Sequence, residues 1–112
     1  MKSSDGNTVA IGSPVNNEVF VYNYTTSWEQ KGKPITGMSG DGFGFSVALS
    51  DDGDTIAIGA PLSNYAVIYK YSNEWSQYDS KISGETGDYF GYNVSLSSSN
   101  NILTVGTSPF LV

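Results

Sequence analysis

Carboxylates are the side chains through which this chain could carry out acid–base chemistry. The sequence has 11 Asp and Glu, but no histidine and no cysteine. The absence of histidine removes the commonest general base and the commonest metal ligand, and the absence of cysteine removes thiolate catalysis and zinc–thiolate sites. Paired carboxylates, as used in glycoside hydrolysis, are the remaining chemistry to consider.

Four carboxylates are candidates for such a pair: Glu18, Asp41, Glu85 and Asp88. A glycosidase needs two of them to face one pocket at a separation of roughly 5 Å or roughly 6.5–9.5 Å. Asp41 and Asp88 lie 47 residues apart (88 − 41), a spacing that recurs along the chain, so a shared turn role is the better interpretation. We therefore predict that the chain is not an enzyme and assign it no catalytic residue. A glycoside hydrolase is the alternative.

The overall charge excludes two classes of partner. With only five Lys and Arg and a net charge of −6, the chain cannot neutralise many phosphates, so we expect no nucleic-acid binding. Anionic membrane surfaces are excluded for the same reason, and no stretch is long and apolar enough to insert into a bilayer. The start of the chain has no apolar segment of the kind found in signal peptides.

A repeat of 47 residues organises the chain. Gly12, Gly59 and Gly106 sit in three matching segments, because 59 − 12 and 106 − 59 both equal 47. The alignment needs no gap, and a fixed period of this size is typical of a repeat array. The matching segments are 4–14, 51–61 and 98–108; 40–47 and 87–94 also match, and Trp28 falls on Trp75.

Each unit predicts four short strands in an antiparallel meander. A tight turn at 51–54 joins the first two strands, and Gly53 supplies the positive φ that such a turn usually needs. Short connections throughout favour neighbouring antiparallel strands. In the complete unit the strands are expected at 43–49, 55–60, 66–71 and 75–82, and in the last unit at 90–96 and 102–105.

Alternation along these strands predicts one bulky and one flat face for each sheet. A bulky face packs on a flat face without voids, which favours sheets stacked around a common axis, as in a β-propeller. A two-sheet sandwich is the alternative, but it would not need small residues in phase every 47 positions. The bulky side chains are Phe43, Phe45, Val47 and Leu49 in the first strand and Ile56 and Ile58 in the second; the small ones are Gly44, Ser46 and Ala48, and Ala57 and Gly59.

The fourth strand is expected to form the outer edge of each sheet, because it comes last in the meander. In the first unit it holds Lys31, Lys33 and Pro34, and lysine and proline discourage edge-to-edge pairing. Trp28 and Trp75 open this strand in the two units. We expect them to cover the end of the hairpin, and we favour this structural role over ligand stacking.

Three segments of the unit, 40–49, 56–61 and 66–71, resemble the FG-GAP repeat. The segment Trp-Ser-Gln at 75–77 is similar to the bacterial, algal and large-virus branch of these repeats. The resemblance covers essentially the whole chain. Its signature residues are Phe43-Gly44 and Phe90-Gly91 for the "FG" and Gly59-Ala60-Pro61 for the "GAP", with Gly12-Ser13-Pro14 as a close variant.

The resemblance implies a β-propeller, typically of seven blades in the integrin α-subunit. Members of this family are mostly extracellular or surface-displayed, and they serve adhesion and ligand binding. On this basis we expect an extracellular or surface-displayed module that is built from propeller blades and binds a protein or carbohydrate ligand.

Many integrin-type repeats also carry a calcium loop between the first two strands, and this chain departs from that pattern. The corresponding turn holds Asp51, Asp52 and Asp54 within four residues. Calcium takes six to eight oxygens, and a short hairpin turn cannot wrap an ion to supply them. We therefore expect no cofactor and treat these three aspartates as, at most, a weak calcium site.

The chain holds just over two units, whereas a propeller needs at least about four blades to close. We divide it into a partial blade over residues 1–39, a complete blade over 43–86 and a partial blade over 90–112. It is therefore expected to be a piece of a larger propeller, which we favour, or a protomer that closes with copies of itself. In both cases its partners include further blades, because exposed sheet faces drive association.

The loops at one rim of the blades are the expected binding surface. The loops at 13–17, 37–42, 61–64 and 84–88 are rich in Ser, Asn, Asp and Gly, which suit contacts with protein or glycan partners. A purely structural surface-layer repeat is the alternative. Asn23 begins an Asn-Tyr-Thr sequon near a hairpin and is a candidate for N-glycosylation.

Overall fold

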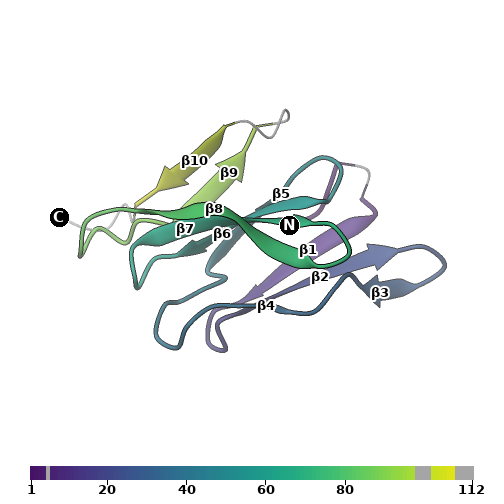
Figure 1. Ribbon diagram of the computed structural model, residues 1–112, viewed down its shortest axis with the longest axis horizontal. Helices are drawn as coiled ribbons and strands as arrows, with labels where there is room; N and C mark the ends of the chain where they lie inside the picture. Colours follow the sequence, from purple (N-terminus) through teal and green to yellow (C-terminus); the bar gives the residue numbers. More distant parts are fainter. Residues whose placement is uncertain (5, 98–101, 108–112) are drawn as a thin grey trace.

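The chain folds into three antiparallel sheets (Figure 1). The computed structural model describes residues 1–4, 6–97 and 102–107. Within these ranges there are ten strands and no helix. Accordingly, none of the described elements is a helix that could span a membrane. The all-β fold class is confirmed.

Each sheet is a meander of neighbouring strands. The first sheet contains β1 (Thr8–Ser13), β2 (Glu18–Tyr24), β3 (Trp28–Gln30) and β4 (Ile35–Thr36), with β3 and β4 both paired to β2. The middle sheet contains β5 (Ser46–Leu49), β6 (Thr55–Ala60), β7 (Tyr65–Tyr71) and β8 (Trp75–Ser83) in that order. The third sheet pairs β9 (Asn93–Leu96) with β10 (Leu103–Gly106).

The three sheets lie side by side, with the middle sheet between the other two (Figure 1). β6 is buried along its whole length, because the first sheet covers one face of the middle sheet and the third sheet covers the other. Sheets that stack in this way are β-propeller blades and not the two layers of a sandwich. The division of the chain at 1–39, 43–86 and 90–112, and the number of blades in a closed ring, stay predictions.

Glycine lets neighbouring sheets approach closely. A Cβ atom at Gly12 would overlap the carbonyl oxygen of Gly44, and one at Gly59 would overlap the carbonyl oxygen of Gly91. The flat faces of the first and middle sheets therefore pack against Gly44 and Gly91, which lie just before the first strand of the next sheet. This agrees with the flat face that the alternation in β6 predicted.

The bulky faces differ in how far they are covered. Ile58, on the bulky face of the middle sheet, is 0% exposed. Ile11 occupies the same position in the first sheet, 47 residues earlier, and is 50% exposed. The first sheet covers Ile58, whereas none of the sheets formed by the described residues covers Ile11.

The backbone repeats as closely as the sequence does. Twelve of the positions with positive φ form six pairs separated by 47 residues, and several of them lie in tight turns, where glycine and asparagine accept this conformation at low cost. The same local strain is thus built into each unit. The pairs are Gly6 and Gly53, Asn17 and Asn64, Gly32 and Asp79, Gly40 and Gly87, Gly42 and Tyr89, and Gly44 and Gly91.

The first strand of the middle sheet is shorter than predicted, and its two phenylalanines do not share a face. Residues 43–45 form a turn that the Phe45 backbone N–H closes by donating to the Gly42 carbonyl at 3.0 Å. Gly44 takes φ of 93° in this turn, a value that a side chain disfavours. As a result Phe43 is 1% exposed and Phe45 is 49% exposed, so the alternation predicted from residue 43 onward holds only from β5.

The fourth strand of the first sheet is also different from the prediction. It is interrupted between β3 and β4, and Lys31, which lies in the interruption, is buried. Lys31 therefore does not protect an outer edge. The middle sheet keeps an unbroken fourth strand, β8, at its outer edge, as the meander predicts.

Some of the predicted turns lie outside the described residues. These are Asp5 in the first turn, the turn at 98–101 and the part of the last unit from residue 108 onward.

Candidate binding surface

Four loops come together at one rim of the sheets. They connect β1 to β2, β6 to β7, the first sheet to the middle sheet, and the middle sheet to the third. Main-chain hydrogen bonds tie them in the same way in both units: Gly37 N–H donates to the Asn17 carbonyl and Gly84 N–H to the Asn64 carbonyl, each at 2.8 Å. The rim is therefore a rigid platform whose loops are held by backbone and not by side chains alone.

Asp41 fixes the rim where two of these loops meet. Its carboxylate accepts hydrogen bonds from the hydroxyls of Ser63 and Tyr65, both at 2.6 Å. Its carbonyl accepts from the Leu62 backbone N–H at 3.1 Å. Lys81 stands over the ring of Tyr65, with Nζ 4.4 Å from the ring centroid. Asp41 thus clamps the β6–β7 loop to the loop that enters the middle sheet.

The environment of Asp41 sets its protonation. Burial alone would raise the pKa of this carboxyl, but the hydrogen bonds from Ser63 and Tyr65 outweigh it and lower the pKa below the usual value. The same contact, added to burial, raises the pKa of Tyr65 above its usual range. At neutral pH the Asp41 carboxyl is therefore ionised and accepts these hydrogen bonds, and a carboxylate in this state is a poor general acid.

Two of the four glycosidase candidates, Asp41 and Asp88, lie in equivalent turns. Asp41 N–H donates to the Met38 carbonyl at 3.1 Å, and Asp88 N–H donates to the Glu85 carbonyl at 3.2 Å, so both aspartates occupy the same turn in successive units. Glu18 lies half-buried in β2, and Glu85 is exposed. This geometry favours the shared turn role.

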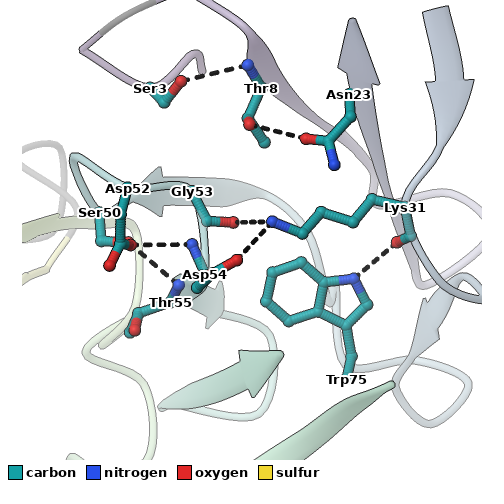
Figure 2. Close-up of polar contacts among 10 residues, drawn as sticks. All are labelled: Ser3, Thr8, Asn23, Lys31, Ser50, Asp52, Gly53, Asp54, Thr55 and Trp75. Atoms are coloured by element: carbon teal, nitrogen blue, oxygen red, sulfur yellow. Dashed lines mark hydrogen bonds and ion pairs between the residues drawn. The ribbon is translucent and has the colours of Figure 1, made fainter. Parts of the chain in front are cut away.

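The predicted calcium candidates, Asp51, Asp52 and Asp54, lie in the turn between β5 and β6, at the end of these strands opposite to the β6–β7 loop. Figure 2 shows Asp52 and Asp54 in this turn. Asp52 accepts hydrogen bonds from Ser50 Oγ at 2.7 Å and from the Asp54 N–H at 3.0 Å, and these bonds lower its pKa. Asp54 Oδ1 lies 2.6 Å from Lys31 Nζ. Asp51 is exposed. Across the part of the chain that the structure describes, no group of three or more acidic side chains gathers where it could hold a metal ion.

A recurring serine that sequence reasoning missed accepts the same hydrogen bond in all three units, from the backbone N–H five residues later. Ser3 Oγ accepts from the Thr8 N–H at 3.1 Å, and Ser50 Oγ accepts from the Thr55 N–H at 3.0 Å. Ser97 Oγ accepts from the Ile102 N–H at 3.1 Å. The three serines are 47 residues apart, so the spacing held the signal, although the residue type is too common to stand out.

Lys31 is the second feature that the sequence did not reveal (Figure 2). Its ammonium group crosses from the first sheet to the middle sheet, where it donates to the Gly53 carbonyl at 2.8 Å and to Asp54 at 2.6 Å. In return Trp75 Nε1–H donates to the Lys31 carbonyl at 2.8 Å. Lys31 Nζ also lies 5.0 Å from the Tyr71 ring centroid. We call this group of contacts the Lys31 staple.

Replacing Lys31 with methionine should lower the free energy of unfolding by about 2 kcal/mol, because the buried Gly53 carbonyl and Asp54 lose a charged donor. The side chain of Asp54 is 53% exposed and can regain water, which keeps the loss moderate. Urea unfolding would measure the effect. Lys33→Met is the matched control, since Lys33 is exposed; equal losses for the two variants would contradict the role of the staple.

The lowered pKa values of Asp41 and Asp52 predict a dependence of stability on pH. Both carboxyls have an ordinary value of 3.8, so their stabilising effect is complete above that pH and is lost as pH falls through the lower folded-state pKa. Protonation of other carboxylates relieves repulsion in an acidic chain and acts in the opposite direction. The double variant Asp41→Asn/Asp52→Asn should therefore lose less stability than the parent between pH 5 and pH 2 in urea titrations; a parallel loss would contradict the assignment.

Asn23, the predicted glycosylation site, lies in β2 and pairs with Glu29 of β3. Its Oδ1 accepts a hydrogen bond from Thr8 Oγ1 at 2.8 Å (Figure 2). The side chain is half-buried. Its modification stays a prediction.

The signature residues meet at one structural point. The N–H of Gly44 in the "FG" donates to the carbonyl of Gly59 in the "GAP" at 3.1 Å, and Gly91 does the same to Gly106. Ala60 ends β6 and Pro61 begins the β6–β7 loop, and both residues are buried. Tyr89, Phe90, Gly91 and Tyr92 repeat the turn around Phe43, with the Tyr92 N–H donating to the Tyr89 carbonyl at 3.0 Å.

Four-stranded meanders that stack bulky face on flat face, with their loops tied at one rim, define this chain as a set of β-propeller blades. Residues 28–74 match the FG-GAP repeat, and this span of 47 residues (74 − 28 + 1) equals the period. The chain therefore contains an FG-GAP repeat, which confirms the resemblance. No curated protein matches the chain in sequence. The repeat indicates a propeller-type binding or scaffold module of a kind that is typically non-catalytic.

Proposed function

We propose that the chain is a non-catalytic adhesion, binding or scaffold module that contacts a protein or a glycan through the rim of loops at 13–17, 37–45, 61–64 and 84–92. The observation that carries the proposal is that hydrogen bonds hold the backbone of these loops, while the side chains at the loop tips are exposed to solvent. Hydrogen bonds hold the loops in the same way in both units, whereas Val15, Met38 and Leu62 at their tips are largely exposed. Rigid loops that present free side chains are suited to recognition.

A glycan array and an array of cell-surface proteins, both probed with the labelled protein, would test this function. We expect binding on one of the arrays, and we expect Leu62→Ser at the rim to weaken it. Ile102→Ser is the matched control, because Ile102 is equally exposed at the opposite rim. Binding to neither array would favour the structural surface-layer alternative and contradict the proposal.

We further propose that the uncovered face of the first sheet binds another blade, from the same protein or from a copy of this chain. The contrast between exposed Ile11 and buried Ile58 supports this, because the two residues hold equivalent positions. In isolation the chain should therefore associate, and Ile11→Glu should reduce its native mass. Met38→Glu, at an exposed rim position, should leave the mass unchanged. A monomeric parent protein would contradict the proposal.

The family resemblance is the basis for a proposed location, and the geometry of the β5–β6 turn is the basis for a proposal about metal binding. We propose an extracellular or surface-displayed location, with no cofactor in the β5–β6 turn. Peptide mapping after secretion from a eukaryotic host would show whether Asn23 carries a glycan. Calorimetry with calcium would show whether Asp51, Asp52 and Asp54 bind the ion despite their existing contacts.

A further inference from the structure

An apolar groove of about 460 Å³ opens on the rim. Two loop tips line it from the first and middle sheets, through Val15 and Leu62. Aromatic rings line it from the segments that enter the middle and third sheets, through Phe45, Tyr89 and Tyr92. None of the side chains that line the groove carries a charge.

The groove is assembled from equivalent positions of neighbouring units. Val15 and Leu62 are 47 residues apart, and so are Phe45 and Tyr92. The rings of Phe45 and Tyr92 pack together with centroids 5.2 Å apart. Nevertheless Val15 is 92% exposed and Leu62 is 62% exposed, so these large apolar side chains contribute little to the fold. Exposed apolar side chains that gather in one groove are typical of an interaction site.

Acidic residues adjoin the lining residues of this apolar groove along the chain. Asp41 precedes Gly42 of the groove wall, Asp88 precedes Tyr89, and Glu85 is exposed nearby in the same loop. The chain as a whole carries −6. Of its basic side chains, Lys31 binds Asp54 at the other rim, and Lys81 lies over the Tyr65 ring beside Asp41. Glu85 and Asp88 are therefore exposed acidic side chains next to the groove, in a chain of net negative charge.

An apolar groove next to acidic residues favours one class of partner over two others. A second copy of the chain would bring a like-charged rim to the groove and would be repelled. A glycan would find polar side-chain partners only in the two tyrosine hydroxyls, whereas sugar recognition relies on several directed hydrogen bonds. A protein segment with large apolar side chains beside Lys or Arg satisfies both the apolar wall and the acidic surroundings.

We propose that the groove binds a protein segment in which aromatic or aliphatic side chains are flanked by basic residues. This inference rests on the proposed binding function and narrows it to a class of partner. The apolar side chains fill the space between the loop tips and the rings, and the basic residues lie against the acidic rim.

Synthetic hexapeptides would test the inference in calorimetric or NMR titrations of the protein. The probe is Lys-Lys-Trp-Leu-Lys-Lys, and its controls are the same peptide with Glu for Lys and the same peptide with Ser for Trp and Leu. We expect the probe to bind at least about tenfold more tightly than either control, and we expect its binding to weaken as salt is added. Equal binding of the Glu peptide, or of the Ser peptide, would overturn the proposal.

Variants locate the binding site. Leu62→Ser and Val15→Ser should each weaken binding of the probe by about tenfold while leaving the unfolding midpoint unchanged, because both side chains are exposed. Met38→Ser, at another exposed rim position outside the groove, should bind like the parent. Asp88→Asn should weaken binding and reduce its salt dependence, whereas Glu74→Gln at the opposite rim should not. Binding that is unchanged in both groove variants would overturn the proposal.

The arrays separate failure of this inference from failure of the proposed function. A partner on either array that binds parent and Leu62→Ser equally overturns the groove but leaves a binding module. A dimer of the parent that Leu62→Ser disrupts, seen by sedimentation, assigns the groove to a second copy and overturns the inference. Failure of the peptides together with the absence of any array partner overturns both.

Discussion

Replacing Gly59 with alanine is expected to lower the free energy of unfolding by about 3 kcal/mol. The new Cβ atom would overlap the carbonyl oxygen of Gly91, which leads into the third sheet, and it would also meet Ser46 Oγ. The serine can rotate, but the carbonyl belongs to a backbone turn that is fixed by hydrogen bonds to Gly106. The middle and third sheets would therefore have to move apart. Urea unfolding, followed by tryptophan fluorescence, would measure the loss.

The repeat supplies its own controls for this substitution. Gly12→Ala should be comparably destabilising, because its Cβ would overlap the carbonyl oxygen of Gly44. Gly106→Ala should cost much less, because the atoms nearest to its Cβ belong to the side chain of Asn93, which can rotate. A similar loss in all three variants would show that glycine acts through strand flexibility and not through sheet approach.

The sequence predicted the architecture well because the contacts between sheets require small residues at fixed positions. Gly12, Gly59 and Gly106 recur in phase for the reason given by the structure: a backbone carbonyl occupies the space of a side chain at two of them. A requirement of this kind makes small residues recur at a fixed spacing in the sequence. The meander order, the all-β class and the tight turn at Gly53 could be predicted from the repeat.

The details that could not be predicted depend on contacts between units that are not periodic. Lys31 matches Tyr78 in the next unit, and Asp54 matches Asn101, so the charged pair of the staple occurs at one junction and has no counterpart in the repeat. Alternation along the strand predicts an edge position for Lys31. It cannot predict the burial of this side chain, because its partners, the Gly53 carbonyl and Asp54, belong to another sheet. Phe45 was misplaced for a different reason: the turn at Gly44 reverses the alternation just before β5 begins.

The candidate site shows the same division. The predicted strand order places these loops at one rim. In the structure, main-chain hydrogen bonds join the loops at that rim. The groove, however, depends on the depth to which each loop tip is buried. Val15 and Leu62 lie in short loops whose sequences look like ordinary connectors. Hydrogen bonds from Gly37 and Gly84 to the Asn17 and Asn64 carbonyls hold these loops, and both side chains are exposed. Sequence spacing alone cannot give that exposure.

Replacing Phe43 with alanine should lower the free energy of unfolding by about 4 kcal/mol. Phe43 packs into the core between the first and middle sheets, where its ring meets Tyr69 edge-on with centroids 6.5 Å apart. Gly37 leaves room for the ring, since a Cβ at Gly37 would overlap it. Removal of the ring therefore leaves a cavity that neighbouring backbone is not free to fill. Urea unfolding would again measure the loss.

Two aromatic residues test whether burial or sequence motif sets the size of this effect. Phe90 holds the "FG" position in the next unit but is only half-buried, so Phe90→Ala should cost clearly less than Phe43→Ala. Phe45→Ala should cost about 1 kcal/mol, because half of this side chain is exposed and its main neighbour is Tyr92. If Phe45→Ala proved as damaging as Phe43→Ala, both rings would have to face the core. The simple alternation predicted from residue 43 would then be right, and the turn at Gly44 would not separate the two faces.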